Sequence, residues 1–200
     1  MSQEIKIIKD GGIGVIPTDT IYGLVGSAFS RVAVERIYKI RRRERNKPFI
    51  ILISSINDLN KFGVKPTKEI LAFLKRVWPG PVSIILPISD KRPAYAKASA
   101  FGRRNRLRPT KSAGKQETKD KFRYLHRGTR TIAFRLPRDK RLRNFLKKTG
   151  PLVAPSANIS GRPPAKNIAE AKKYFGNKVD FYLNGGEIFG EPSVILEIKR

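Results

Sequence analysis

The chain has 200 residues, a length that suits one domain with a sizeable core. It has no cysteine, which excludes disulfides and thiolate zinc sites, and no apolar run of membrane-spanning length. The N-terminus lacks the features of a signal peptide, so we expect a cytoplasmic protein without a membrane partner. The 43 Lys and Arg residues against 16 Asp and Glu give a net charge of +27, which indicates anionic partners unless the whole proteome is basic.

The first part of the chain predicts a helix, a strand and a polar loop. Ser2 caps a helix to about Lys9, and the strand that follows stops at Pro17, which cannot donate to a sheet. Four hydroxyl or carboxylate side chains then fall within residues 18–22, beside Gly23, whose small size lets a ligand approach. The segment predicts a small-molecule site or, with equal weight, an ordinary capped turn. We expect residues 26–29 to form a loop.

Ser30 caps a second predicted helix, to about Ile40, and this helix runs into five cations within residues 41–47. Such a run is usually a solvated helix end, where basic side chains also suit the helix dipole. The functional alternative is a phosphate clamp, because Arg grips phosphate oxygens in a bidentate way. The continuous apolar run at 49–53 predicts a strand buried on both faces.

Two later segments place polar groups beside predicted core strands. Arg135 lies near the end of an alternating strand, where a buried cation needs a counter-charge that a bound anion would supply. Ser156, Asn158 and Ser160 alternate, so an extended segment would point all three the same way; a plain Ser/Asn loop is the alternative. The remaining predictions are helices at about 55–61, 67–77, 138–148 and 168–175, and strands at 82–86, 131–137, 152–154, 181–183 and 193–198.

Residues 89–122 differ from the rest, because Ala, Lys, Arg, Ser and Gly dominate and no period survives. We predict a flexible basic insertion. Binding of single-stranded RNA through Tyr95 and Phe101 is one alternative, and a loop without a role is the other. We expect His126, the chain's only histidine, to be a loop residue, since one imidazole without cysteine makes no zinc site.

The alternation of strands and helices predicts an α/β fold in a single domain spanning residues 1–200, with a twisted, mixed sheet and flanking helices.

Three segments resemble signature motifs of the YrdC/Sua5 family, the L-threonylcarbamoyladenylate synthases. They are Pro-Thr-Asp-Thr-Ile-Tyr-Gly-Leu at 17–24, Pro-Gly-Pro-Val-Ser at 79–83 and Ala-Pro-Ser-Ala-Asn-Ile-Ser-Gly at 154–161. The resemblance covers nearly the whole chain except about 89–122, and it is similar to the short, single-domain form. It implies a YrdC-like domain with an open, positively charged concave site.

The resemblance also implies a reaction. L-Threonine and bicarbonate form N-carboxythreonine, whose new carboxylate attacks the α-phosphate of ATP and releases pyrophosphate. The product, threonylcarbamoyl-AMP, then serves partner proteins that modify adenosine 37 of tRNA. No covalent nucleophile is required, so no residue is expected to be catalytic beyond positioning and charge stabilisation. We expect Mg²⁺ to be held mainly by the nucleotide, because the sequence shows no carboxylate cluster.

By position in the family motifs, the resemblance assigns two sets of site residues. The threonine-binding set is Thr18, Thr20, Tyr22 and Ser156, and the ATP-binding set is Arg41, Arg43, Lys47, Ser83, Arg135, Asn158 and Ser193. Two positions depart from the family pattern: Arg41 stands where the family has Lys, and Val194 replaces a Thr. The competing hypothesis is a double-stranded RNA-binding or ribosome-associated module without catalysis, which explains the basic residues but not the Thr, Ser and Asn positions.

Overall fold

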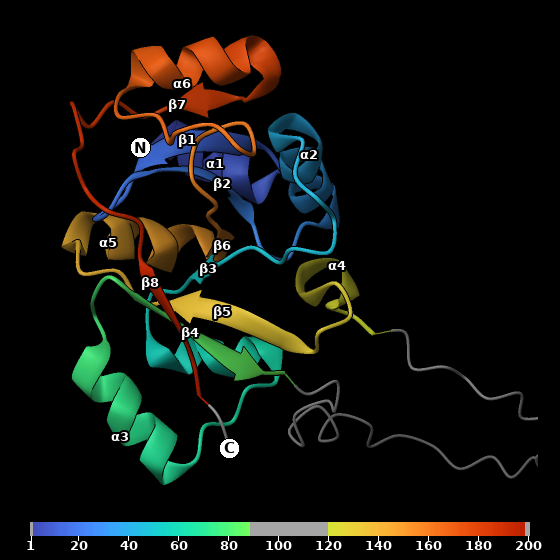
Figure 1. Ribbon diagram of the computed structural model, residues 1–200, viewed down its shortest axis with the longest axis vertical. Coiled ribbons are helices and arrows are strands. Elements are labelled where there is room, and N and C mark those ends of the chain that lie inside the picture. Colours follow the sequence, from blue (N-terminus) through green and yellow to red (C-terminus); the bar gives the residue numbers. More distant parts are fainter. Residues whose placement is uncertain (1, 89–119, 199–200) are drawn as a thin grey trace, which may run out of the picture.

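The computed structural model describes residues 2–88 and 120–198 and confirms an α/β fold. One mixed eight-stranded sheet runs through the molecule, with helices on both faces (Figure 1). The strands are β1 (Ile13–Pro17), β2 (Tyr22–Ser27), β3 (Ile51–Leu52), β4 (Val82–Pro87), β5 (Thr131–Arg135), β6 (Leu152–Val153), β7 (Phe181–Tyr182) and β8 (Val194–Glu197). The helices are α1 (Ser2–Lys9), α2 (Arg31–Arg41), α3 (Lys68–Val77), α4 (Arg123–His126), α5 (Lys140–Thr149) and α6 (Ile168–Phe175), with 3-10 turns η1 (Ile56–Phe62) and η3 (Gly176–Lys178).

The strand order is β7-β1-β2-β6-β3-β5-β4-β8, so segments distant in sequence become neighbours. The pairs β1/β7, β3/β5 and β4/β8 are parallel, and the other neighbours are antiparallel. The short central strand β3 lies between β6 and β5, and Leu52 is in register with Arg135 on one side and Leu152 on the other. β6 runs parallel to β1 and antiparallel to β5, so the chain leaves β1 and β6 at the same end of the sheet, whereas Arg135, the last residue of β5, is level with the start of β6.

Two apolar layers sandwich the sheet. On one face, α1 and α5 pack through Ile8, Leu142 and Phe145 against strand residues such as Val25. The other face carries the larger core, with Val34 and Ile37 of α2 among its members. The helix α5 shows why the sequence folds this way, because its Leu and Phe side chains recur at helical spacing while basic residues occupy the other side.

Most predicted helix ends are confirmed. The hydroxyls of Ser30 and Thr67 accept hydrogen bonds from the first turns of α2 and α3, and Gly150 and Gly176 follow α5 and α6. The start of α5 differs from the prediction at 138, because the Asp139 carboxylate accepts from Leu142 N (2.9 Å) and is the N-cap.

Two local predictions are wrong. Residues 26 and 27 continue β2, which starts at Tyr22, because each residue of β1 pairs with one of β2 in a tight antiparallel hairpin; only residues 18–21 form the loop. His126 is buried at the end of α4, where its Nδ1 accepts from Gly128 N (3.1 Å) and Arg130 N (3.2 Å). Its Nε2 lies 2.7 Å from an Asp120 carboxylate oxygen.

The predicted insertion falls mostly on residues 89–119, which lie outside the described part of the chain. At its C-terminal end, Phe122 is buried, and its ring lies near those of Phe29 (6.4 Å) and Phe62 (5.4 Å). In the described residues no helix is both long and apolar enough to cross a bilayer.

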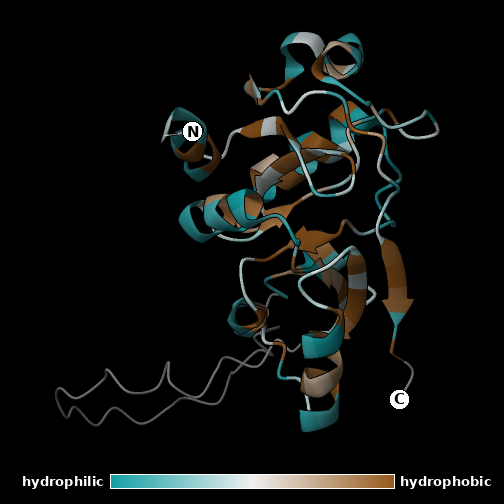
Figure 2. Cartoon of the chain, turned by 90° about the vertical axis from the view of Figure 1, so that its left-hand side faces the viewer, coloured by the Kyte–Doolittle hydropathy of each residue, from teal (hydrophilic) through white to brown (hydrophobic). Residues whose placement is uncertain are grey.

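The segment between β7 and β8, residues 183–193, crosses from one edge of the sheet to the other (Figure 1). We call this segment the strap. It lies directly on the 18–21 loop, since a Cβ placed on Gly190 would stand 1.8 Å from the Thr20 carbonyl oxygen. β8 itself is an edge strand with exposed apolar side chains, which Figure 2 shows as a brown arrow. The strap therefore brings residues 192 and 193 close to the 18–21 loop, Arg135 and residues 154–156.

Candidate functional site

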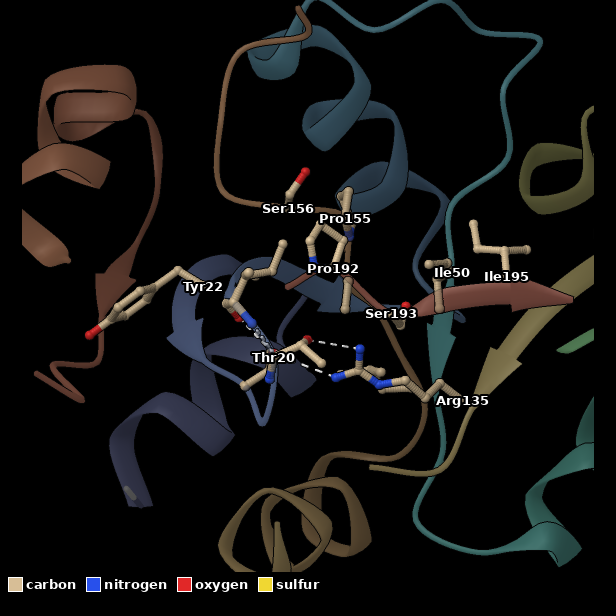
Figure 3. Close-up of a pocket in the computed structure, with 14 residues that line it drawn as sticks. Thr20, Tyr22, Ile50, Arg135, Pro155, Ser156, Pro192, Ser193 and Ile195 are labelled. Atoms are coloured by element: carbon tan, nitrogen blue, oxygen red, sulfur yellow. Dashed lines mark hydrogen bonds between the residues drawn. The ribbon is translucent and has the colours of Figure 1, made fainter. Parts of the chain in front are cut away.

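A pocket of about 140 Å³ lies where four chain segments meet (Figure 3). The 18–23 segment, Arg135 at the end of β5, the 154–156 segment after β6 and the end of the strap all contribute. One part of its wall is apolar, with Ile50, Leu52 and Ile195, and the rest carries hydroxyls and a guanidinium. The lining residues are Thr18, Thr20, Ile21, Tyr22, Gly23, Ile50, Leu52, Arg135, Ala154, Pro155, Ser156, Pro192, Ser193 and Ile195.

The 18–21 loop is held by the hydroxyl of Thr18. This hydroxyl donates to Ile21 O (2.6 Å) and accepts from the backbone N–H groups of Thr20 (3.2 Å) and Ile21 (3.3 Å). Because its single hydrogen goes to a carbonyl, which can only accept, Thr20 is the donor in the 3.0 Å contact between the two hydroxyls. The Thr20 hydroxyl therefore meets a ligand as an acceptor.

Arg135 is buried and reaches this loop from β5. Its Nη1 donates to Thr20 Oγ1 (2.9 Å), and its Nη2 lies 2.5 Å from Asp19 Oδ1 and 3.5 Å from Thr18 Oγ1 (Figure 3). Burial lowers the pKa of Arg135, and the Asp19 carboxylate opposes that effect. Its Nε is buried without a hydrogen-bond partner among the described residues, which leaves a donor for a ligand.

The sequence predicts a bound anion as the counter-charge of Arg135, and the structure corrects this prediction. Asp19 supplies the counter-charge from within the chain. Asp19 was part of the recognised motif, but its place between two hydroxyl residues gave no reason to single it out. The signal that would have found it is the pairing of a lone acid in the loop with a predicted buried cation.

Arg41 is a second buried guanidinium, at the C-terminal end of α2. Its Nε donates to Asn158 O (3.0 Å), and its Nη2 donates to Asn158 Oδ1 (2.6 Å) and Ser156 Oγ (3.1 Å). Burial, followed by the charge of Arg43, lowers its pKa to about 10. Since its hydrogen-bond partners among the described residues are neutral oxygens, Arg41 places a positive charge that no carboxylate there compensates behind Ser156.

Ser156 and Asn158 lie together, but not on an extended segment as predicted. Asn158 N donates to Ser156 O (3.0 Å), which closes a turn, and Ser160 N donates to Arg41 O (2.8 Å). The Ser156 hydroxyl donates to Asn158 Oδ1 (2.8 Å) and accepts from Arg41, so its remaining lone pair faces a ligand as an acceptor. Asn158 does not line the pocket; it holds Ser156 and Arg41 in place.

The other assigned residues lie at different distances from the pocket. Ser193 lines it and shares a 2.9 Å hydroxyl contact with the buried Ser83, which stands behind it on β4. The Tyr22 ring points away from the pocket in Figure 3, and its hydroxyl donates to Gly186 O (2.7 Å) in the strap. Arg43 lies over the Phe49 ring (5.6 Å), and Lys47 pairs with Glu44 (2.7 Å) on the surface, so neither lines the pocket.

The charge of the site is less positive than the family resemblance implies. Of the described lining residues, Arg135 alone carries a formal charge, and Asp19 compensates it. The positively charged character of the site therefore stays a prediction that depends on Arg41 behind the pocket and on Arg43 and Lys47 beyond it.

Within the described residues no three His, Cys, Asp or Glu side chains gather in a group that could hold a metal ion. The pocket's own donors and acceptors are hydroxyls, the Arg135 guanidinium and backbone groups. This set does not fit a protein-bound divalent cation. It suits a small ligand that offers a carboxylate to Arg135 and N–H or O–H donors to Thr20 and Ser156.

Comparison with protein families gives a match that covers nearly the whole chain. The Sua5/YciO/YrdC family profile, described as "Telomere recombination", matches residues 6–105 and 111–200. The threonylcarbamoyl-AMP synthase of Pyrococcus abyssi is 28% identical over 96% of this chain and 49% of its own length. The threonylcarbamoyl-AMP synthase of Bacillus subtilis is 25% identical over 98% of this chain and 49% of its own length. The chain thus spans about half the length of these curated relatives.

Among solved structures, P. abyssi Sua5 complexed with L-threonine has a TM-score of 0.77 and 27% identity, covering 98% of this chain and 50% of that one. The fold similarity therefore extends over the whole sheet and includes all four segments that form the pocket.

Proposed function

Because the chain belongs to the Sua5/YciO/YrdC family, we propose that it is a threonylcarbamoyl-AMP synthase, a nucleotidyltransferase that uses L-threonine, bicarbonate and ATP. The observation that carries the proposal is the meeting of Thr20, Arg135 and Ser156 in one pocket. These residues come from three separate strand exits, so an ordinary turn does not explain their convergence.

L-Threonine occupies the pocket in this proposal. A volume of about 140 Å³ is below the roughly 300–1,000 Å³ of sites for drug-sized ligands, and it suits one amino acid. The threonine carboxylate meets Arg135, whose Nε is unpartnered, and its donors meet the acceptor oxygens of Thr20 and Ser156. The synthase names of the relatives and the L-threonine complex of P. abyssi Sua5 support the choice of ligand. Thr18 and Tyr22 contribute indirectly, by holding the loop and the strap.

ATP extends beyond the pocket, because the pocket is too small for a nucleotide. Ser193, supported by Ser83, lines one side, and Arg41 lies behind Ser156, held by Asn158. We place the triphosphate on the side where Arg43 and Lys47 follow α2. Arg43 is half-buried over Phe49 and Lys47 is exposed in a surface pair with Glu44, so both would exchange these contacts for phosphates, whereas Arg41 acts through its field.

The chemical step needs no protein nucleophile. The carbamate oxygen of N-carboxythreonine attacks the α-phosphorus of ATP, the bond to the bridging oxygen breaks, and pyrophosphate leaves with the electron pair. The chain's contribution is to hold the two anionic substrates together and to stabilise the charge that develops, with no catalytic residue in the strict sense. Mg²⁺ enters with the ATP phosphates, and no role assigned to a residue here depends on it.

The test is release of pyrophosphate from ATP by the purified chain, with mass-spectrometric detection of threonylcarbamoyl-AMP. We expect release to require both L-threonine and bicarbonate. Release that is independent of threonine, or absent at saturating substrates, contradicts the proposal. Tight binding of duplex RNA without any pyrophosphate release would favour the competing RNA-binding module. Delivery of the product to tRNA-modifying partners in the cytoplasm is a further part of the proposal.

A further inference from the structure

Asp19 connects the pocket's guanidinium to the turn between β5 and α5. Its Oδ1 lies 2.5 Å from Arg135 Nη2, and its Oδ2 accepts from Arg138 N (2.7 Å). Its side chain is 10% exposed, and that of Arg135 is 5% exposed, so water screens the pair weakly. Asp19 does not itself line the pocket.

The contacts of Asp19 decide which N–H groups of Arg135 remain for a ligand. Thr20 occupies one Nη1 hydrogen, and Asp19 and Thr18 occupy Nη2. The buried Nε has no partner among the described residues. Arg135 is thereby fixed in one orientation. Asp19 compensates its charge, and its Nε–H remains available to a ligand.

We propose that Asp19 is a positioning and specificity-determining residue, which fixes Arg135 and cancels its charge so that the pocket favours a zwitterionic amino acid over inorganic anions. The preference for an amino acid rests on the proposed function, whereas the compensated charge of Arg135 follows from the Asp19–Arg135 geometry alone.

The physical reason is the cost of a buried, uncompensated charge. Without Asp19, the buried Arg135 guanidinium would keep only hydroxyls as hydrogen-bond partners among the described residues, and a small anion would be drawn in to neutralise it. The proposed reaction brings the ATP phosphates, pyrophosphate and bicarbonate to the same site, and inorganic phosphate is the simplest probe of such anions. Arg41 adds a further positive charge behind Ser156, which makes the compensation of Arg135 more important.

A neutral replacement separates this role from a structural one. In Asp19→Asn the side-chain oxygen still accepts from Arg138 N, while the amide removes the negative charge facing Arg135. If Asp19 only connected the 18–21 loop to the turn at residue 138, Asp19→Asn would hardly change the affinities for phosphate and L-threonine. If Asp19 sets the charge of the pocket, the same variant changes which ligands the pocket binds.

The experiment is titration calorimetry of the full chain with inorganic phosphate and, separately, with L-threonine. We expect Asp19→Asn to bind phosphate about tenfold more tightly or better, because a close charge pair of this kind is worth at least about 1.4 kcal/mol. Threonine affinity should stay equal or fall. Asp19→Glu, which keeps the charge, should bind phosphate as weakly as the wild type. Asp139→Asn is the matched control, because Asp139 caps α5 on the surface and lies outside the pocket, and it should change neither affinity.

The double variant Asp19→Asn/Arg135→Met should lose the gain in phosphate affinity, which would locate the effect at Arg135. If Asp19→Asn unfolds, judged by circular dichroism, Asp19→Ser repeats the test with a smaller neutral acceptor. Phosphate affinity unchanged in the neutral variants, or reduced together with threonine affinity, overturns the proposal. If the wild type binds no threonine while the phosphate change appears, the proposed function is contradicted and the role of Asp19 stands.

Discussion

Arg135 and Arg41 are both buried guanidinium groups beside the same pocket, but their charges are balanced in different ways. Arg135 faces the Asp19 carboxylate at 2.5 Å. Arg41 has neutral partners, the oxygens of Ser156 and Asn158. Burial lowers the pKa of both groups, and for Arg41 it reaches about 10 with the charge of Arg43 as the second cause.

A buried cation can therefore contribute to a binding site in two ways. A compensated one offers directional hydrogen bonds without a strong field, which suits the recognition of one carboxylate. An uncompensated one offers a field, which suits a polyphosphate that never touches it. Arg135 therefore belongs with the amino acid and Arg41 with the nucleotide, and the experiments below test that division.

The largest effect is expected for Arg135→Met. Removing the cation leaves Asp19 buried without its partner, which should cost about 3–5 kcal/mol in the free energy of unfolding. Threonine binding should also be lost, because the variant removes the donors assigned to its carboxylate. Urea unfolding and titration calorimetry measure the two effects.

The double variant Asp19→Asn/Arg135→Met is the control for this prediction. It should recover most of the unfolding free energy while threonine binding stays lost. If the single variant were as stable as the wild type, the Asp19–Arg135 pair would not be the buried ion pair described here.

Arg41→Met should have a smaller effect on stability, about 1–2 kcal/mol, because hydrogen bonds to neutral oxygens and a contact with the Phe49 ring are lost while a buried charge is relieved. We expect the KM for ATP to rise about tenfold or more, while direct threonine binding changes less. An equal loss in both would contradict the division between the two arginines.

A milder change at the same position gives a pH test. Lys has a lower intrinsic pKa than Arg, about 10.4, and the same burial lowers it further. A base with a lowered pKa loses its charge as the pH rises. In Arg41→Lys, kcat/KM for ATP should therefore match the wild type near pH 7 and begin to fall at a lower pH than in the wild type, where the pKa of Arg41 is about 10. Parallel profiles from pH 7 to 9.5 would show that the charge at position 41 is not used.

The smallest effect is expected for Ser83→Ala. Ser83 is buried and touches the site only through the 2.9 Å contact with Ser193. Losing this neutral hydrogen bond should cost about 1 kcal/mol and change the KM for ATP by about fivefold or less. Ser193→Ala, which removes the hydroxyl that lines the pocket, should have at least as large an effect in steady-state assays. The reverse order would place Ser83 in direct contact with the nucleotide.

The fold could be predicted well from local signals. Ser30, Thr67 and Gly150 mark helix ends through the hydrogen bonds and backbone angles that these residue types provide, and the structure confirms them. The hairpin of β1 and β2 was missed in part, because the polar residues 18–22 resemble a loop until the pairing of Pro17 with Tyr22 is known.

The site could be predicted as a list of residues, but their arrangement depended on contacts far apart in the chain. Residue order alone did not reveal that Asp19 lies against Arg135, 116 positions away, or that Asn158 faces Arg41. The motif at 17–24 did identify the loop itself. Tyr22 lines the pocket and its hydroxyl binds the strap at Gly186, so its assigned contact with the ligand stays a prediction.

The most direct test of the central claim is a crystal structure of the chain with L-threonine and a non-hydrolysable ATP analogue. We expect the threonine carboxylate to lie on Arg135 and the triphosphate on the side of Arg43 and Lys47. The α-phosphate should lie next to the threonine amine. Threonine bound outside the pocket formed by Thr20, Arg135 and Ser156, or a nucleotide on a separate surface, would contradict this expectation.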